Sequence, residues 1–285
     1  MINFEKSMEI QLSKFASFCK GVQIAFDKAE EVAKSAPRPL YMLGDLVNNK
    51  EVVRRFEEKG IKMIESLDEI KSGTLIITAH GISPKLRRLI LERGINIVDT
   101  TCFGVNVVHL WAKRFAAEGR RVIIVGKKDH REVLGVMEEI EKPIVITDLE
   151  EVKKINLSRE TPIGVVSQTT FKVSKFKKIA AEIKKKFSDV KIQDTICCST
   201  HDRQEDVRQL ARQNEVAIVI GDPKSSNSVE LYNTAREVNP NSYFIATAAE
   251  IKSEWFKGKK TVCIATGAST PKWIINETIE KIKVL

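Results

Sequence analysis

Three cysteines recur at matching positions in three copies of one chain pattern, and this repeat limits what the chain can fold into. Cys102 and Cys197 end near-identical phrases, Ile-Val-Asp-Thr-Thr-Cys and Ile-Gln-Asp-Thr-Ile-Cys. After each cysteine come a helical stretch, an apolar run and a glycine, Gly126 or Gly221, at an offset of 24 residues. Cys19 begins the same layout with an offset of 25 residues. Such self-similarity indicates that one supersecondary unit is repeated.

The alternation of short apolar runs with amphipathic helical stretches sets the fold class. Continuous apolar runs of strand length are typical of parallel strands buried on both faces. We therefore predict an α/β protein made of three similar small domains with parallel sheets. The repeats give the domain boundaries as residues 12–96, 97–191 and 192–280. Because no segment rich in Pro, Gly or Ser separates the repeats, we expect the domains to pack tightly.

Composition excludes several classes of protein. With 285 residues, of which 42% are hydrophobic, the chain has enough apolar surface for a large core or for several small ones. No apolar run reaches the ~18 residues of a membrane span, and the first residues lack the layout of a signal peptide. We expect a cytoplasmic protein. Five cysteines in such a chain do not form a disulfide framework, so those at repeated positions indicate metal binding or catalysis.

The net charge of +9 has two readings. Much of it belongs to solvated helices, such as the lysine-rich segment 175–186. A positive potential would also attract an anionic substrate or an acidic electron carrier. RNA binding is not favoured, because aromatic residues are only 6% of the chain and no stacking motif is interleaved with the charge.

The three repeated cysteines are predicted metal ligands. Each stands where a helix is expected to begin, and backbone N–H groups there favour the thiolate. Their wide spacing differs from the local Cys-x-x-Cys of zinc ribbons and ferredoxins. Three thiolates suit a cubane iron–sulfur cluster with one iron not held by protein, or a zinc ion that also binds water. Cys198 is interpreted as a core or supporting residue, and Cys263 as a core residue.

A predicted anion site follows the apolar run at residues 216–220. Ser225, Ser226 and Asn227 precede a helix, and hydroxyls, an amide and backbone N–H groups at a helix start can hold phosphate. An ordinary helix cap with extra serines is the alternative. Asn48 and Ser269 have equivalent positions after other apolar runs. Because ligands of parallel sheets bind beyond the carboxyl ends of the strands, we expect these residues to face one cleft.

The middle of the chain supplies candidates for acid chemistry. His80 and His130 lie at predicted strand ends, where imidazole can bind phosphate. Glu132 falls in the first turn of a helix and serves either as a proton donor to the cleft or only as a partner of the helix dipole. Thr169 and Thr170 complete the strand-end pattern of the middle repeat.

Short motifs along nearly the whole chain resemble those of one enzyme family. They are Phe18-Cys19-x-Gly21-Val22, Ala79-His80-Gly81, Asp99-x-Thr-Cys102, His130-x-Glu132-Val133, Gln168-Thr169-Thr170, Ile196-Cys197, Thr200-x-x-Arg203-Gln204, Ser225-Ser226-Asn227 and Gly267-Ala-Ser269. Together they resemble the 4-hydroxy-3-methylbut-2-enyl diphosphate reductases of the LytB type, which belong to the non-mevalonate isoprenoid pathway.

This resemblance implies a pseudo-threefold trefoil of α/β domains around a [4Fe–4S] cluster bound by Cys19, Cys102 and Cys197. The substrate hydroxyl would bind the unique iron and leave as water, with electrons from ferredoxin or flavodoxin. The products would be isopentenyl and dimethylallyl diphosphate. The residues that would hold the diphosphate are Asn48, His80, His130, Thr170, Ser225, Ser226, Asn227 and Ser269. Glu132, Thr169 and His130 would serve the proton relay.

The chain departs from the family pattern near the expected cleft. Asn48 replaces a histidine, Ser17 a glycine, and Phe103 a proline. Lys20 and Asp202 also differ from the usual residue types. Three alternatives therefore stay open at this point: a LytB-like paralogue that reduces another substrate, a non-catalytic iron–sulfur sensor or RNA-associated protein, and a zinc hydrolase that uses the three thiolates.

Overall fold

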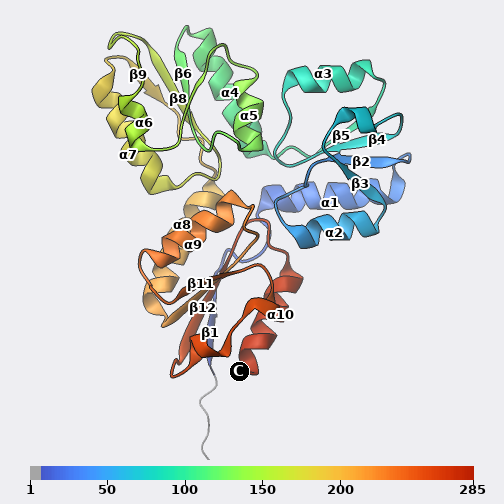
Figure 1. The fold of residues 1–285 in the computed structure, drawn as a ribbon, viewed down its shortest axis with the longest axis vertical. Coiled ribbons are helices and arrows are strands. Elements are labelled where there is room, and N and C mark those ends of the chain that lie inside the picture. The colour runs from blue at the N-terminus through green and yellow to red at the C-terminus, as the bar shows by residue number, and fades with distance from the viewer. Residues whose placement is uncertain (1–7) are drawn as a thin grey trace, which may run out of the picture. The chain divides into compact units, whose positions relative to one another are not determined.

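The computed structural model describes residues 8–285, which form two compact units. One unit consists of Gly21–Val47 and Val53–Cys197. The other consists of the chain up to Lys20, with Asn48–Val52 and Cys198–Leu285. The extreme N-terminus, predicted above to lack a signal peptide, lies outside the described residues. Within residues 8–285 the strands form three four-stranded sheets, each parallel throughout (Figure 1).

The first sheet follows the first repeat and has the strand order β3-β2-β4-β5. Its strands are β2 (Leu40–Leu43), β3 (Ile61–Ile64), β4 (Thr74–Ile77) and β5 (Asn96–Asp99). The helices of this repeat are α1 (Lys20–Ser35), α2 (Lys50–Glu58), the short η1 (Leu67–Glu69) and α3 (Pro84–Glu92). Central strand β4 is buried along its whole length, as the apolar run predicts.

The second sheet follows the second repeat and has the equivalent order β7-β6-β8-β9. Its strands are β6 (Arg121–Val125), β7 (Ile144–Ile146), β8 (Ile163–Ser167) and β9 (Val190–Ile192). Its helices are α4 (Phe103–Ala117), α5 (Arg131–Met137), α6 (Leu149–Lys153) and α7 (Val173–Lys186). Helix α7 buries one apolar face and exposes most of its lysines, so the prediction of a solvated lysine-rich helix is confirmed.

The third sheet, with the order β1-β12-β10-β11, joins the two ends of the chain. Its strands are β10 (Val216–Ile220), β11 (Ser242–Ile245), β12 (Thr261–Thr266) and the N-terminal β1 (Glu9–Leu12). Its helices are α8 (Cys198–Gln213), α9 (Ser226–Arg236), the short η2 (Ala248–Glu250) and η3 (Ser253–Phe256), and α10 (Lys272–Lys283). Strand β1 lies before the first predicted domain except for its last residue, Leu12, and it pairs with β12 of the third repeat.

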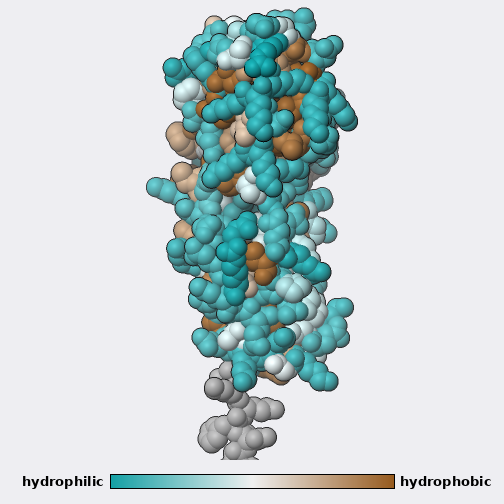
Figure 2. Space-filling view, turned by 90° about the vertical axis from the view of Figure 1, so that its left-hand side faces the viewer, coloured by the Kyte–Doolittle hydropathy of each residue, from teal (hydrophilic) through white to brown (hydrophobic). Residues whose placement is uncertain are grey.

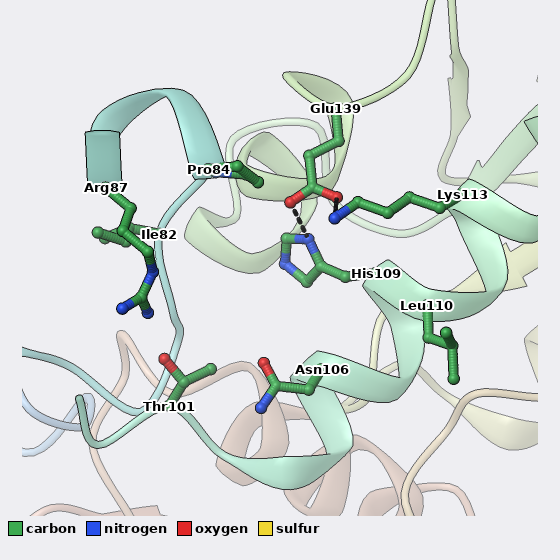
Figure 3. A pocket seen from close by; sticks show the side chains of 9 residues that line it. All are labelled: Ile82, Pro84, Arg87, Thr101, Asn106, His109, Leu110, Lys113 and Glu139. Carbon is green, nitrogen blue, oxygen red and sulfur yellow. Dashed lines mark hydrogen bonds and ion pairs between the residues drawn. The ribbon is translucent and has the colours of Figure 1, made fainter. Parts of the chain in front are cut away.

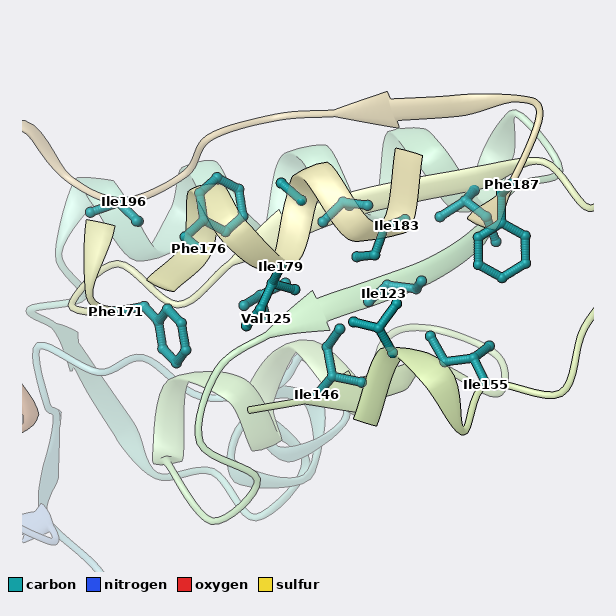
Figure 4. Packing of buried hydrophobic residues seen from close by; sticks show 14 residues of the cluster. Ile123, Val125, Ile146, Ile155, Phe171, Phe176, Ile179, Ile183, Phe187 and Ile196 are labelled. Carbon is teal, nitrogen blue, oxygen red and sulfur yellow. The ribbon is translucent and has the colours of Figure 1, made fainter. Parts of the chain in front are cut away.

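Alternating burial explains why these strands are apolar throughout. In β6, Ile123 and Val125 face one cluster with α6 and α7, in which Ile179 and Ile183 pack (Figure 4). Val122 and Ile124 face the opposite cluster with α4 and α5. Successive strand residues point to opposite faces, so a sheet covered on both faces needs apolar residues at every position. The predicted α/β class with three parallel sheets is confirmed.

Figure 2 shows a face on which hydrophilic residues dominate and hydrophobic residues appear in small groups. Among the described residues, no helix is long and apolar enough to cross a membrane.

Candidate active site

The three repeated cysteines have equivalent backbone positions. Each directly precedes a helix, and its N–H donates to a carbonyl just beyond the end of a central strand. These bonds run from Cys19 to Ala268 (3.1 Å), from Cys102 to Ala79 (3.0 Å) and from Cys197 to Thr169 (3.0 Å). The repeat read from the sequence is thus a structural repeat. It places each thiol beyond the carboxyl end of a sheet, where ligands of parallel sheets bind.

Glycines bring backbone close to two of these cysteines. A Cβ at Gly21 would lie 2.6 Å from the sulfur of Cys102, so only glycine fits there. A Cβ at Gly104 would lie 3.7 Å from Cys197 Cβ and 3.9 Å from Cys102 Sγ, so the two cysteines flank one glycine. Half-buried thiols at helix starts, beside glycine backbone, suit a thiolate-bound metal cluster. Among residues 8–285, no three His, Cys, Asp or Glu side chains form a group that could hold a metal ion.

The other two cysteines differ in environment. Cys198 was expected to be a core or supporting residue, and the core alternative was wrong: Cys198 is exposed as the first residue of α8. Cys263 is fully buried in β12, as predicted. Burial raises the pKa of the Cys263 thiol to about 12, so this thiol stays protonated and unreactive.

Glu132 and Thr169 form a closely bonded pair. Glu132 is 2% exposed in the first turn of α5. The backbone N–H of Thr169 donates to Glu132 Oε1 at 2.7 Å, and the Thr169 hydroxyl donates to Oε2 at 2.6 Å. Burial raises the pKa of Glu132 to about 7, although both bonds from Thr169 act to lower it. A carboxyl with a pKa near neutrality is suited to give up a proton during a reaction.

His80 and His130 face each other at the start of α5. Their ring centroids are 5.8 Å apart in an edge-to-face arrangement. Burial lowers the pKa of His80 to about 3 and that of His130 to about 4, so both rings are neutral at pH 7. Within the described residues, the buried Nδ1 of His130 has no hydrogen-bond partner. An anion that entered here would favour protonation of the rings.

Gln168 orders the turn that carries the threonines. It is fully buried, its Nε2 donates to Thr170 Oγ1 at 2.7 Å, and its Oε1 accepts from the N–H of Lys127 at 3.0 Å. The bond from Gln168 leaves the hydroxyl proton of Thr170 available to donate elsewhere. Gln168 therefore joins the turn after β8 to the turn that leads to His130.

The other unit holds the predicted anion site at the start of α9. Ser225 is the N-cap residue, and its hydroxyl accepts from the N–H of Ser228 at 3.3 Å. Asn227 Oδ1 accepts from the N–H of Ala268 at 2.9 Å, which leaves the amide nitrogen of Asn227 buried without a partner among the described residues. Ser226, like these neighbours, is buried. A buried donor at a helix N-terminus fits a bound anion.

Ser269 and Asn48 meet in the same unit. The hydroxyl of Ser269 donates to the backbone carbonyl of Asn48 at 3.1 Å. Asn49, rather than Asn48, caps α2, since its Oδ1 accepts from the N–H groups of Glu51 and Val52. The bond from Ser269 places the Asn48 turn beside the turn that follows β12.

Arg203 is a buried residue that supports the loop before Cys19. It is 5% exposed. Its guanidinium donates to the carbonyls of Ser17 at 2.7 Å and Thr266 at 2.9 Å. Ser17 has a φ of 85°, a left-handed conformation that favours glycine. The glycine expected here from the family resemblance would adopt this conformation without strain.

Sequence reasoning missed residues that shape the site without facing a ligand. Ser228 packs so closely on Gly221 and Gly267 that a Cβ on either would lie 2.3 Å or less from the Ser228 hydroxyl oxygen. The glycines after two apolar runs were the available signal, because a glycine at a strand end often permits close backbone approach. Gln168 and Arg203 lay within quoted motifs and had no assigned role.

The predicted site residues divide between the two units. The unit of the first two sheets holds Cys102, Cys197, His80, His130, Glu132, Thr169 and Thr170. The other unit holds Cys19, Asn48, Ser225, Ser226, Asn227 and Ser269. One set thus carries the acid and the histidines, and the other carries the serine cradle.

Comparison with known proteins gives one consistent result. The family model described as LytB protein matches residues 10–283. A 4-hydroxy-3-methylbut-2-enyl diphosphate reductase from Aquifex aeolicus is 38% identical over 281 residues, covering 97% of this chain and 96% of that protein. The reductase of the same description from Geobacter sulfurreducens is 36% identical over 280 residues, covering 97% of both.

Solved structures agree in fold. A structure described as (E)-4-hydroxy-3-methyl-but-2-enyl diphosphate reductase, the terminal enzyme of the non-mevalonate pathway, is 37% identical with a TM-score of 0.71, covering 98% of this chain and 100% of that one. A reductase from Plasmodium falciparum is 28% identical with a TM-score of 0.91, covering 98% of this chain and 88% of that one.

Proposed function

The chain belongs to the LytB protein family, and on this premise we propose that it reduces 4-hydroxy-3-methylbut-2-enyl diphosphate to isopentenyl and dimethylallyl diphosphate. Two electrons and two protons enter, the carbon–oxygen bond of the allylic alcohol breaks, and water leaves. The observation that carries the proposal is the Glu132–Thr169 pair. Glu132 has a pKa of about 7 and bonds to Thr169, and the carbonyl of Thr169 accepts from the N–H of Cys197.

A [4Fe–4S] cluster is the cofactor that we assign to Cys19, Cys102 and Cys197. The residues present fit it, because all three are thiols at helix starts and glycine backbone lies against the sulfur of Cys102. When bound, the cluster would supply electrons and a Lewis-acidic iron for the substrate hydroxyl.

The diphosphate is assigned to the start of α9 and to the paired histidines. The unpaired amide nitrogen of Asn227 and the hydroxyls of Ser225 and Ser226 offer donors to phosphate oxygens. His80 and His130 are neutral in the structure, so each can donate one hydrogen bond at once and gain a proton as the anion binds.

Proton delivery is assigned to Glu132. Near neutral pH about half of a population with a pKa of about 7 carries the proton. The Thr169 hydroxyl, 2.6 Å from Glu132 Oε2, is placed to pass that proton on or to hold the carboxyl in position. The surrounding burial excludes bulk water, which would otherwise compete as a proton source.

The enzyme also needs an electron donor and a compartment in which to work. A two-electron reduction needs an electron donor, which we identify as a small carrier protein of the ferredoxin or flavodoxin class. We place the reaction in the cytoplasm.

The metal assignment is tested with two adjacent cysteines. In anaerobically purified protein, Cys197→Ser should lose most of its iron and sulfide, whereas Cys198→Ser, at an exposed residue, should keep both. Iron, sulfide and zinc are measured on the same samples. Full iron content in Cys197→Ser would overturn the assignment, and zinc without iron would favour the hydrolase alternative.

The activity is tested by reducing the diphosphate with dithionite and methyl viologen. Glu132→Gln should lower turnover about 100-fold or more, a typical loss for a general acid. Glu138→Gln, at an exposed carboxyl next to the end of the same helix, is the matched control. Normal turnover in Glu132→Gln would remove this residue from the mechanism. An intact cluster without turnover of this diphosphate would favour a paralogue with another substrate.

A further inference from the structure

Each repeated cysteine follows an edge strand and is tied to the end of the neighbouring central strand. Its N–H donates to the carbonyl two residues after the last residue of that strand, which is Ile77 in β4, Ser167 in β8 and Thr266 in β12. The carbonyl of this last strand residue also accepts a hydrogen bond in all three repeats. The donor is a side chain that the proposed mechanism does not use.

The turn before Cys102 shows this arrangement in its simplest form. The hydroxyl of Thr100, which is buried, donates to the carbonyl of Ile77 at 2.5 Å. Asp99 accepts from the N–H of Thr101 at 2.8 Å and so closes the turn that leads to the cysteine. The turn is therefore fixed by one bond to the strand and one bond within itself.

Arg87 of α3 holds Asp99 from outside this turn. The guanidinium pairs with the carboxylate. In Figure 3 the side chain of Arg87 extends from α3 toward Thr101. Asp99 is thus held between a guanidinium and the turn, and charge-assisted bonds of this kind fix the orientation of a carboxylate.

The turn before Cys197 repeats these contacts residue by residue. The hydroxyl of Thr195 donates to the carbonyl of Ser167 at 2.6 Å and accepts from the N–H of the same serine at 2.7 Å. Asp194 accepts from the N–H of Ile196 at 3.0 Å. The phrases Asp-Thr-Thr-Cys and Asp-Thr-Ile-Cys therefore form one kind of turn, with the threonine two residues before the cysteine.

The turn before Cys19 lacks this phrase, because Ala16 and Ser17 stand at the positions of the aspartate and the threonine. A residue from another element supplies the bond instead. Arg203 of α8 donates to the carbonyl of Thr266 at 2.9 Å and to that of Ser17 at 2.7 Å. The N–H of Ser17 also donates to the hydroxyl of Thr266 at 2.9 Å. One buried guanidinium thus takes the place that a threonine hydroxyl has in the other two repeats.

We propose that Thr100, Thr195 and Arg203 are positioning residues that fix the three cysteine turns for the metal centre. This inference rests on the proposed function, because the cluster is the group that the thiols would hold. Each of the three side chains bonds to backbone, so it acts through the turn that carries the cysteine. Groups that orient metal ligands commonly contribute about ten- to hundredfold to metal affinity.

Thr100→Val tests the proposal in the anaerobically purified full chain, because it removes the hydroxyl at nearly constant volume. The carbonyl of Ile77 keeps its bond from the N–H of residue 100, which is 3.1 Å long, so the variant should fold. The rate of iron loss to a chelator should rise about tenfold. Thr100→Ser restores the hydroxyl and should return this rate to within about twofold of wild type.

Thr278→Val is the matched control. Thr278 is fully buried in α10, and its hydroxyl also donates to a backbone carbonyl, that of Ile274, at 2.9 Å. This variant should lower the free energy of unfolding in urea as much as Thr100→Val does, yet release iron at the wild-type rate. Arg203→Met is compared in the same way with Arg208→Met on the same helix, and only Arg203→Met should release iron faster.

The electron paramagnetic resonance spectrum of the reduced cluster gives a readout that a loss of stability does not change. The g-values should shift in Thr100→Val and Arg203→Met and stay as in wild type in Thr278→Val. Equal rates of iron loss in Thr100→Val and Thr278→Val would overturn the proposal. Rapid iron loss from Thr100→Ser would overturn it too, because the hydroxyl would then not be the group that matters.

These measurements also separate the positioning role from the proposed function. Turn variants that release iron faster, in a protein that never reduces the diphosphate, would keep the positioning role and reject the substrate. Wild-type rates of iron loss in every turn variant of an active reductase would keep the substrate and reject the positioning role. Zinc without iron in wild type would reject the cluster, and zinc release from the same variants would then decide whether the turns hold the metal.

Discussion

Replacement of Glu132 by glutamine should stabilise the protein while it removes activity, and the gain should depend on pH. Glu132 is 2% exposed, and its pKa is raised from 4.5 to about 7 because burial disfavours the charged form. The difference corresponds to about 3 kcal/mol at 1.36 kcal/mol per pH unit. Glutamine keeps both contacts, since its oxygen can accept from the Thr169 N–H and its amide can donate to the Thr169 hydroxyl.

Protonation of Glu132 is thermodynamically linked to folding, so its effect on the free energy of unfolding depends on pH. The folded state binds the Glu132 proton more tightly than the unfolded state, so the carboxyl does not weaken the fold below pH 4.5. As pH rises from 4.5 to about 7, the unfolded state loses its proton first and the fold is progressively weakened. Above about pH 7 the whole cost of about 3 kcal/mol is present. Glutamine carries no such cost at any pH.

Urea unfolding of wild type and Glu132→Gln, followed anaerobically from pH 5 to pH 8.5, measures this difference. The stability gain should be small at pH 5 and about 3 kcal/mol at pH 8. Glu138→Gln, at an exposed carboxyl, should show no such trend. A gain in Glu132→Gln that stays constant with pH would refute the reasoning, because it would mean that the carboxyl titrates alike in both states.

Other residues give shorter tests. Ser17→Gly should raise the free energy of unfolding by about 0.5–1 kcal/mol, because glycine adopts a φ of 85° without strain. The higher entropy of the unfolded glycine chain offsets part of this gain. A lower free energy of unfolding in urea would contradict the prediction. Asn48→His should lower KM for the diphosphate about tenfold through a charge-assisted bond worth ~1–2 kcal/mol. Steady-state kinetics measure KM, and an unchanged value would contradict this prediction. Pyrophosphate should raise the pKa of His130 above its value of about 4, which an NMR titration would measure. If this pKa did not rise, His130 would not belong to the anion site. Gly164→Ala should destabilise by about 1–3 kcal/mol, because its Cβ would lie 2.5 Å from Phe115, and an unchanged melting temperature would show that the ring moves freely.

Much of the fold could be predicted because the physical signal is local. The apolar runs at β4, β6, β8, β10 and β12 are central strands covered on both faces, so their interior positions are apolar or glycine. The partner of β1 could not be predicted in this way. Its sequence, Glu-Ile-Gln-Leu, is mostly exposed and carries no mark of the strand that it pairs with about 250 residues later.

The candidate site, like the fold, could be predicted only in part from the sequence. The family resemblance predicted that Glu132 and Thr169 serve one proton relay, and the structure bonds them directly. Cys198 was misplaced because the start of a helix has a solvent side that the sequence does not identify. The low pKa of His80 could not be anticipated either, since it arises from burial and from a facing histidine fifty residues away.

The pairing of β1 with β12 has a consequence for the order of assembly in the cell. Glu9 aligns with Thr261, and the N–H of Cys19 is held by the carbonyl of Ala268. A ribosome delivers the N-terminus first, so the first cysteine must wait for almost the entire chain before its position is set. The first two sheets contain Cys102 and Cys197 and draw only on earlier residues. A nascent chain would therefore order the turns of Cys102 and Cys197 early and that of Cys19 only after β12 and Ala268 are made, so insertion of the proposed cluster would have to follow synthesis of the third sheet.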